Sequence, residues 1–376
     1  MRILHVTEAA WAGTLQVVRT LAADQVASGH DVTLVYADHP QAPADLALTA
    51  AAGVTLVPLA WPRRSPPGQL AAGRALRRLV RERRPELVHL HSSFAGAVGA
   101  LALPRGLPLI YTPHGFAFAR QGVGRAIGAA VRAVEALVAR RCAVVGAVSE
   151  AEAELARSGL RAPRVAVVRN GIPELDRGVP ERSLDRAAPA AVSLGRIAAQ
   201  RRPAATARIL AALAADARVS WIGGSGDGND SVVRDAGIPV TGWLPHGEAL
   251  ERLAEATVYV HWSAWDGQSL AILEAIARDV AVVASDIPAN REIVGARQVC
   301  TDEQSAIELA RSVLRDPVLR AELLAEQRRR APEFGARRMS AEWLAVYERT
   351  LRPASGVRMQ IATAALAAPI IGEPWI

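Results

Sequence analysis

The chain has 376 residues, of which 51% are hydrophobic, so it is long enough for two domains of ordinary size, each with its own core. The formal net charge of +7 comes from the first half, since residues 1–178 hold 21 arginines against 13 acids. We find no helix-turn-helix, zinc-finger or RNA-stacking motif, which argues against a nucleic-acid-binding protein. The charge favours an anionic ligand or surface instead.

The two cysteines, Cys142 and Cys300, lie far apart in the sequence and have no metal-like partners nearby. They indicate a reducing, cytoplasmic compartment rather than a disulfide-stabilised scaffold. The first residues carry no basic segment followed by an apolar run, so we expect no secretion signal. No run of about 20 apolar residues would span a bilayer.

Short apolar strands alternate with helical stretches through the first half. The expected strands have the sequences RILHV, DVTLVY, VTLVPL, ELVHLH, LPLIYT, AVVGAVS and RVAVVRNG, and a helix is expected from Thr14 to Ala27. Near-continuous Val, Leu and Ile runs are typical of parallel strands buried on both faces. Helices between such strands build a doubly wound sheet, so we expect an α/β domain over residues 1–172.

Three residues of this half follow expected strands and are candidates for a site at the carboxyl edge of the sheet. Gly13 precedes a helix whose first amides are able to bind phosphate. His114 follows the strand LPLIYT, and His91, at the end of ELVHLH, is the weaker second candidate. A loop histidine is about as often a structural hydrogen bonder as a catalytic residue.

The segment from Trp61 to Pro85 is strongly basic. On a helix its arginines form one stripe, while Ala72, Leu76, Leu79 and Val80 form an apolar stripe able to face the core or lipid. We expect the basic stripe to dock on an anionic membrane, and a solvated helix face is the competing interpretation. The stripe consists of Arg74, Arg77, Arg78, Arg81 and Arg84.

Residues 173–189 contain prolines and charges without a period, which predicts a linker. Strand patterns then resume with AAVSLGR, RVSWIGG, IPVTGWL, TVYVHWS and VAVVASD, followed by helical sequence over residues 303–351. We expect a second doubly wound domain over 190–351, facing the first across a cleft. Residues 352–376 are expected to form a tail that packs back on the first domain.

Two arginines, Arg196 and Arg201, lie on the loop after the first strand of this domain, where they are well placed to neutralise a diphosphate. Ordinary surface arginine is an equally good interpretation. Two further turns follow strands: the first contains Gly223 and Gly224, the second Trp243 and Leu244. The glycines alone indicate a tight turn, and the second turn offers backbone groups to a base.

The stretch AWDGQSLAILEAIARD contains two acids eight positions apart, Asp266 before a helix and Glu274 inside it. A buried helix seldom keeps an acid without a partner. Glu274 is either a ribose-binding carboxylate or a salt-bridged helix acid, and Asp266 is otherwise an N-cap residue. The helix N-terminus between them is expected to attract an anion. It comprises Gly267, Gln268, Ser269 and Leu270.

The segments GRIAAQRRP, WIGGSGDG, VTGWLP, WDGQSLAILEA, VVASDIPANREIV and VRNGIP resemble those of the GT-B retaining glycosyltransferases of family 4. MRILHVTE and TPHGFAF resemble the first domain of bacterial polysaccharide glycosyltransferases in that group. The resemblance runs from Met1 to about Leu351. It implies a GT-B fold of two Rossmann-like domains and a nucleotide-sugar donor, with a UDP-sugar favoured over a GDP-sugar and no essential metal or other cofactor.

The resemblance also assigns roles to residues. It implies that Glu274 binds the ribose, Asp266 the transferred sugar, and Arg196 and Arg201 the diphosphate. His114 lines the donor-sugar site. Amides of Gly267 to Leu270 and the loop at Gly13 assist, and Asn170 lies in the VRNGIP segment of the donor site. This sequence has Asp266 where the family has Glu, and Arg201 where it has Lys.

The resemblance implies transfer of a hexosyl or N-acetylhexosaminyl group to a glycan or polyprenyl-linked acceptor, in cell-surface polysaccharide or glycolipid synthesis. The expected location is cytoplasmic, peripheral on the inner face of the plasma membrane. Two alternatives stay open. One is a sugar-nucleotide epimerase on the same fold. The other is a catalytically silent nucleotide-sugar-binding subunit, which the change at Asp266 makes plausible.

Overall fold

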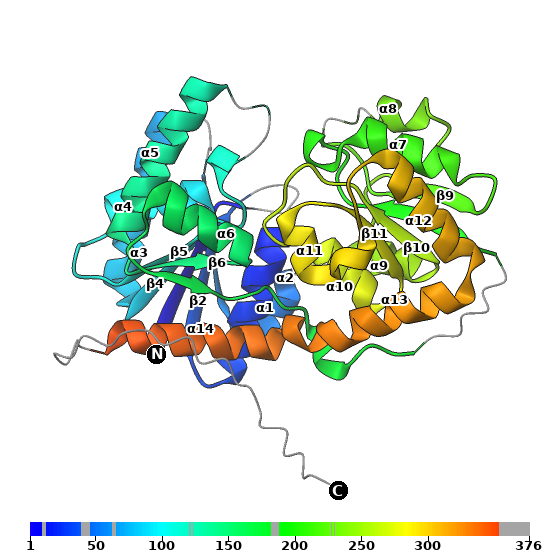
Figure 1. The fold of residues 1–376 in the computed structure, drawn as a ribbon. Helices are drawn as coiled ribbons and strands as arrows, with labels where there is room; N and C mark the ends of the chain where they lie inside the picture. Colours follow the sequence, from blue (N-terminus) through cyan, green and yellow to red (C-terminus); the bar gives the residue numbers. More distant parts are fainter. Residues whose placement is uncertain are drawn as a thin grey trace, which may run out of the picture.

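The computed structural model describes residues 1–9, 13–38, 46–61, 65–119, 122, 124–181, 188–226, 228 and 230–352. Two parallel β-sheets, each flanked by helices, form two domains that lie side by side (Figure 1). The expected α/β class is confirmed. No helix in the described ranges is both long and apolar enough to cross a membrane.

The first domain has a seven-stranded sheet in the order β3-β2-β1-β4-β5-β6-β7. The five inner strands are mostly buried and have runs of apolar residues, whereas the edge strands β3 and β7 are only half-buried. The strands are β1 (Arg2–Thr7), β2 (Asp31–Ala37), β3 (Thr55–Leu59), β4 (Leu87–His91), β5 (Leu109–Thr112), β6 (Val144–Ala147) and β7 (Val165–Val167). The helices are α1 (Gly13–Ala27), α2 (Leu46–Ala51), α3 (Pro66–Arg83), α4 (Ser93–Ala102), α5 (Arg125–Arg141) and α6 (Glu150–Glu154).

The second domain has a five-stranded sheet in the order β12-β11-β10-β8-β9. Its strands are β8 (Ala190–Leu194), β9 (Arg218–Ile222), β10 (Val258–His261), β11 (Ala281–Ser285) and β12 (Val299–Cys300). Its helices are α7 (Pro203–Ala212), α8 (Ser231–Arg234), α9 (His246–Ala254), α10 (Leu270–Ala277), α11 (Pro288–Val294), α12 (Glu303–Arg315) and α13 (Pro317–Arg330). One expected strand is wrong, since IPVTGWL makes only isolated bridges from Val240 to Trp221 and from Gly242 to Gly223.

The last described helix, α14 (Ala336–Leu351), corrects the expected domain boundary. The expected second domain, residues 190–351, includes this helix, but it packs on α1 and on the first sheet (Figure 1). The Tyr347 hydroxyl lies 2.7 Å from His89 Nδ1 on β4. The Trp343 ring lies against Gly146 so closely that an added Cβ there would be 2.2 Å from it. A buried aromatic face thus holds α14 on the first domain.

The expected linker is only partly extended chain. Residues Pro173–Arg177 form a short 3-10 helix. Ile172 N donates to Phe334 O at 3.0 Å, so the segment that leads from the first domain to the second packs beside the segment that leads back to α14. Gly171 is required at this point because a Cβ would lie 2.2 Å from Gly335 O. The tail expected over 352–376 lies, after Arg352, outside the described residues.

Candidate functional site

The two domains meet where the strands of both sheets end, and segments far apart in the sequence touch there. A Cβ added to Gly267, after β10, would lie 3.0 Å from Gly115 N and 3.3 Å from His114 C, after β5. A Cβ on Gly13, at the start of α1, would lie 3.4 Å from the Leu270 side chain. Four of the predicted site residues therefore belong to one junction between the domains.

A charged cluster lies on the second-domain side of this junction. Arg201 Nη1 donates to Asp266 Oδ2 at 3.2 Å and to Ser263 Oγ at 2.7 Å, and it lies 2.6 Å from His261 Nε2. Burial alone would raise the pKa of Asp266, but the hydrogen bond with His261 and the charge of Arg201 together lower it. Burial and Arg201 lower the pKa of His261 to about 4. Asp266 is therefore an ionised acceptor beside a fixed cation.

Glu274 lies one helical turn inside α10 and is 6% exposed. Its Oε1 accepts from Gln16 Nε2 of α1 at 3.3 Å and lies 3.5 Å from His246 Nε2. Burial raises the pKa of Glu274, and the charges of His246 and Arg278 oppose this. Glu274 therefore has one partner from each domain. A groove of about 560 Å³ opens beside His246.

The N-terminus of α10 has an unusual cap. Ser269 is the N-cap residue and is 2% exposed, yet its Oγ makes no hydrogen bond to any residue that the structure describes. The Gln268 amide is held by the backbone of Asn170, accepting at 2.7 Å and donating at 3.2 Å. The side chain of Gln268 therefore joins the domains.

The loop that carries His114 is held in place by a buried acid that the sequence analysis missed. His114 has a left-handed backbone, with φ of 52°. Glu152 accepts from Gly115 N at 2.5 Å and from Val148 N at 2.8 Å. Burial raises the pKa of Glu152 to about 7 against these hydrogen bonds. His91, the weaker candidate, is buried beneath His114.

The glycine turn after β9 packs against the loop that carries Arg196. Gly223 has φ of 124°, and a Cβ there would lie 2.3 Å from Gly195 O, so only glycine allows the strand ends to approach this closely. Trp243 is exposed and its Nε1 donates to Ser225 O at 3.0 Å. Gly224 packs beside Trp243, Leu244 packs on the core, and Arg196 is exposed.

Sequence reasoning overlooked several members of the junction, namely Gln16, Glu152, His246, His261 and Ser263. His261 ends the strand TVYVHWS, so the rule that selected His114 would have found it. Nothing in the sequence around Glu152 or Gln16 marks them, because their roles depend on contacts between distant segments.

Family models match both halves of the chain. Residues 12–171 match the glycosyl transferase 4-like domain, and residues 188–315 match the glycosyl transferases group 1. The chain belongs to the family 4 glycosyltransferases of the GT-B fold. No curated protein matched the sequence.

Solved structures support the same fold for this glycosyltransferase. HepE of Anabaena, in complex with UDP and glucose, is 16% identical, with a TM-score of 0.76 over 93% of this chain and 100% of its own. Sucrose-phosphate synthase of Thermosynechococcus elongatus is 16% identical, with a TM-score of 0.77 over 93% and 98%. WaaG, a glycosyltransferase involved in lipopolysaccharide biosynthesis, is 15% identical, with a TM-score of 0.65 over 88% and 95%.

Proposed function

We propose that this protein is a retaining glycosyltransferase that moves a hexosyl or N-acetylhexosaminyl group from a nucleotide sugar to a glycan or lipid-linked glycan in cell-surface polysaccharide or glycolipid synthesis. One observation carries the proposal. The ion pair of Arg201 and Asp266, the His114 loop and the Leu270–Glu274 helix meet at a single junction between the domains.

The donor nucleotide is proposed to bind over the N-terminus of α10. Ser269 offers a buried hydroxyl without a partner among the described residues, and the first amides of an eight-residue helix favour an anion. Arg201, supported by Arg196, supplies positive charge for the diphosphate. Glu274 accepts hydrogen bonds from the two ribose hydroxyls. We favour UDP over GDP because HepE was solved with UDP and with UDP-glucose.

Transfer is proposed to occur on one face of the donor sugar. The bond from the anomeric carbon to the diphosphate oxygen breaks, the acceptor oxygen bonds to the same face, and the leaving phosphate takes the acceptor proton. Asp266 is paired with Arg201, which suits its carboxylate to accept a hydrogen bond from a sugar hydroxyl rather than to act as a covalent nucleophile. Arginines and helix amides stabilise the leaving charge, so we expect no essential metal.

A thermal-shift screen of UDP- and GDP-sugars, followed by incubation of each stabilising donor with acceptor extracts, tests this function. We expect stabilisation by one UDP-sugar and appearance of a glycosylated acceptor. Formation of an epimer without acceptor would indicate an epimerase. Binding without any turnover would indicate a silent subunit.

The first domain is also proposed to dock on an anionic membrane, although not through the apolar stripe of α3. Ala72, Leu76 and Val80 face the core, so this stripe is unavailable to lipid. The basic residues Arg74 to Arg84 are exposed, with Arg78 paired to Glu82 and Arg77 bonded to Ala102 O.

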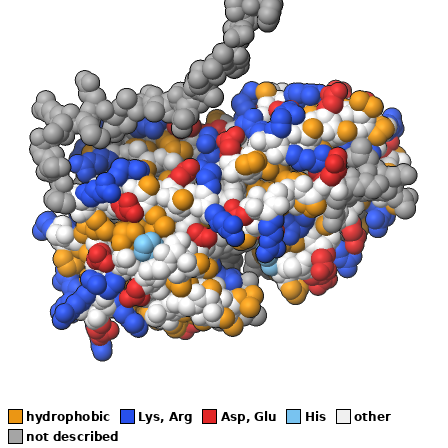
Figure 2. Space-filling view, turned by 90° about the horizontal axis from the view of Figure 1, so that it is seen from below, with side chains coloured by type: hydrophobic (Ala, Val, Ile, Leu, Met, Phe, Trp, Pro, Cys, Tyr) orange, Lys and Arg blue, Asp and Glu red, His pale blue; other side chains and the backbone are white. Residues whose placement is uncertain are grey.

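Exposed apolar side chains on the neighbouring helices strengthen the docking proposal. Leu101 on α4 is 85% exposed, and Ile127 and Leu137 on α5 are each 64% exposed. α3 contacts α4, and Arg77 bonds to Ala102 O, next to Leu101, so the basic stripe lies beside the end of α4. Figure 2 views the molecule from below and shows arginine and hydrophobic side chains interspersed on the first domain, at the left. This combination is typical of a surface that binds anionic lipid.

A further inference from the structure

Four histidines in the first domain are close together, and three of them form a chain that ends at the junction between the domains. Gln25 Oε1 lies 2.8 Å from His5 Nε2, His5 Nδ1 lies 3.0 Å from His91 Nε2, and His91 Nδ1 lies 3.0 Å from His114 Nε2. Gln25, His5 and His91 are buried. His114 Nδ1 has no hydrogen-bond partner among the described residues.

The chain has a direction because each neutral imidazole carries one proton. Burial lowers the pKa of His5 and of His114 to about 4 and that of His91 well below its ordinary value, so the rings are neutral near pH 7. Gln25 Oε1 only accepts, so His5 donates from Nε2 and accepts at Nδ1. His91 must then donate from Nε2 to His5, and His114 from Nε2 to His91.

The orientation of the Gln25 amide decides this direction, since a flipped amide would reverse every bond in the chain. Gln25 Oε1 is the atom that faces His5 Nε2, at 2.8 Å, while Gln25 Nε2 is buried and makes no hydrogen bond to any described residue. The Tyr347 hydroxyl lies 2.7 Å from His89 Nδ1, so α14 also contacts the histidine cluster.

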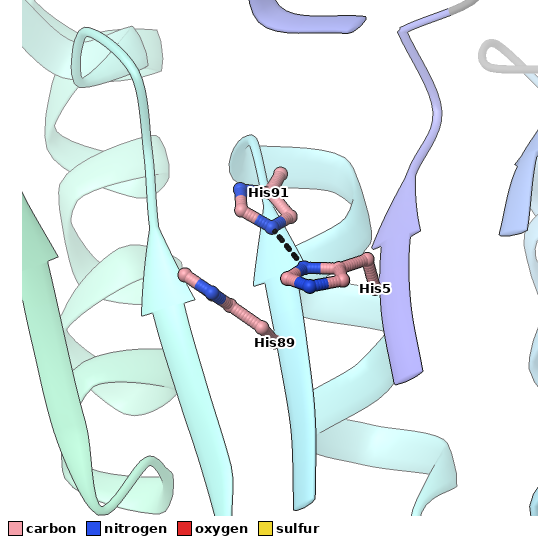
Figure 3. Close-up of side chains that lie close together, drawn as sticks. All are labelled: His5, His89 and His91. Carbon is pink, nitrogen blue, oxygen red and sulfur yellow. Dashed lines mark hydrogen bonds between the residues drawn. The ribbon is translucent and has the colours of Figure 1, made fainter. Parts of the chain in front are cut away.

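His5, His89 and His91 each place a ring nitrogen within 4.8 Å of the other two, as a metal site requires, but all of their ring nitrogens already have hydrogen-bond partners. Figure 3 shows His5 and His91 joined by a hydrogen bond while the His89 ring lies to one side. Both nitrogens of His89 have other partners, Tyr347 at 2.7 Å and Thr112 Oγ1 at 2.8 Å. His89 is therefore a neighbour of the chain rather than a member of it.

We propose that Gln25, His5 and His91 are positioning residues that hold the proton of His114 on Nε2 and keep Nδ1 as an acceptor for a hydroxyl group in the cleft. His114 lies beside Gly267 and so beside the Arg201–Asp266 pair. This assignment rests on the proposed function, in which the hydroxyl belongs to the transferred sugar. The new element is the buried chain that fixes the His114 tautomer from about three side chains away.

The test is NMR of the protein labelled with 15N-histidine, because two-bond proton–nitrogen spectra distinguish the two tautomers. The His114 signals are identified by their loss in His114→Gln. In the unaltered protein we expect His114 to be entirely Nε2-protonated. Gln25→Met and His5→Phe remove the acceptor that sets the direction, so each should give a mixture. His89→Phe is the matched control, since it removes a buried ring of the same cluster outside the chain.

Turnover supplies the second readout. The kcat for sugar transfer should fall at least twofold in Gln25→Met, in proportion to the fraction of His114 that has lost the Nε2 proton, with KM for the donor unchanged. A wild-type His114 protonated on Nδ1 would overturn the proposal even if both variants fail to fold. So would an unaltered tautomer in both variants, an equal change in His89→Phe, or stoichiometric zinc bound by the histidines. If His114→Ala transfers sugar at the normal rate, His114 has no role in binding the donor sugar. The NMR spectra would still test whether the buried chain fixes the His114 tautomer.

Discussion

At the scale of single residues, the proposed donor site depends most on Arg201. It is the cation of the cluster with Asp266, His261 and Ser263. Arg201→Ala should lower kcat by roughly 100-fold or more, because a charge-stabilising donor is worth about 3 kcal/mol. Arg208→Ala is the matched control, since Arg208 pairs with Glu303 on the exposed side of the same domain. Near-normal rates in Arg201→Ala would remove the proposed diphosphate role.

Glu152 predicts how stability depends on pH. Its pKa rises from 4.5 to about 7 on folding because of burial, so the charged form destabilises the folded state. This penalty is absent below about pH 4.5, grows with pH, and is complete above about pH 7. The free energy of unfolding should therefore fall between pH 5.5 and 8 by about 2 kcal/mol more in the unaltered protein than in Glu152→Gln. Denaturant unfolding at both pH values measures this, and parallel behaviour of the two proteins would contradict it.

About half of the residues that meet at the junction could be located from the sequence. His114, Gly13 and the Gly267–Leu270 segment follow strands, and the carboxyl edges of both sheets do face each other. Gln16 and Glu152 could not be found from the sequence. Gln16 is 258 positions from its partner Glu274, and Glu152 is 37 positions from Gly115, so both gain their roles only through tertiary contacts. It also did not foresee that Gln268 is held by the backbone of Asn170.

At the scale of elements, the proposed function assigns nucleotide binding and sugar binding to different acids of the α10 region. Asp266 lies before the helix and Glu274 inside it, and they have different partners. Glu274→Ala should weaken UDP binding by roughly 10- to 100-fold, since hydrogen bonds to a charged group contribute about 1.5–3 kcal/mol. Asp266→Ala should leave the UDP affinity nearly unchanged and weaken use of the intact UDP-sugar. Calorimetry with UDP and with the donor decides this, and an equal loss of both ligands in Asp266→Ala would refute the division.

Element prediction succeeded where a strand has a run of apolar residues, and failed at short elements and at elements whose packing partners come from the other domain. All seven strands of the first sheet were anticipated from apolar runs. The two-residue β12 has no such run, and IPVTGWL has one but contains Pro239 and Gly242, the latter with φ of 74°. The α14 pattern correctly indicates a helix, but its partner sheet is fixed by contacts such as Trp343 on Gly146, which the pattern does not encode.

At the scale of the whole molecule, the charge and apolar exposure of the first domain predict reversible membrane docking. Binding to anionic vesicles should be strong at low salt and lost at high salt, since each arginine near the surface contributes about 1 kcal/mol. Changing the five α3-region arginines to glutamine should abolish it. Leu101→Ser with Leu137→Ser should weaken the binding at low salt, because an apolar contribution is lost.

Co-sedimentation with anionic and neutral vesicles measures this docking. Replacement of Arg311 and Arg315 by glutamine is the control for lost charge, since both pair with Asp216 in the second domain. Absence of binding to anionic vesicles, or binding that survives the five changes, would refute the docking proposal.

The central claim is retaining transfer from a nucleotide sugar at the junction between the two domains. Its most direct test is the stereochemistry of the product formed from the UDP-sugar that stabilises the protein, with a polyprenyl-linked acceptor and EDTA present. We predict transfer without added metal, and an NMR coupling constant at the anomeric carbon that shows the configuration of the donor. An inverted product, or no transfer from any nucleotide sugar, would contradict the account.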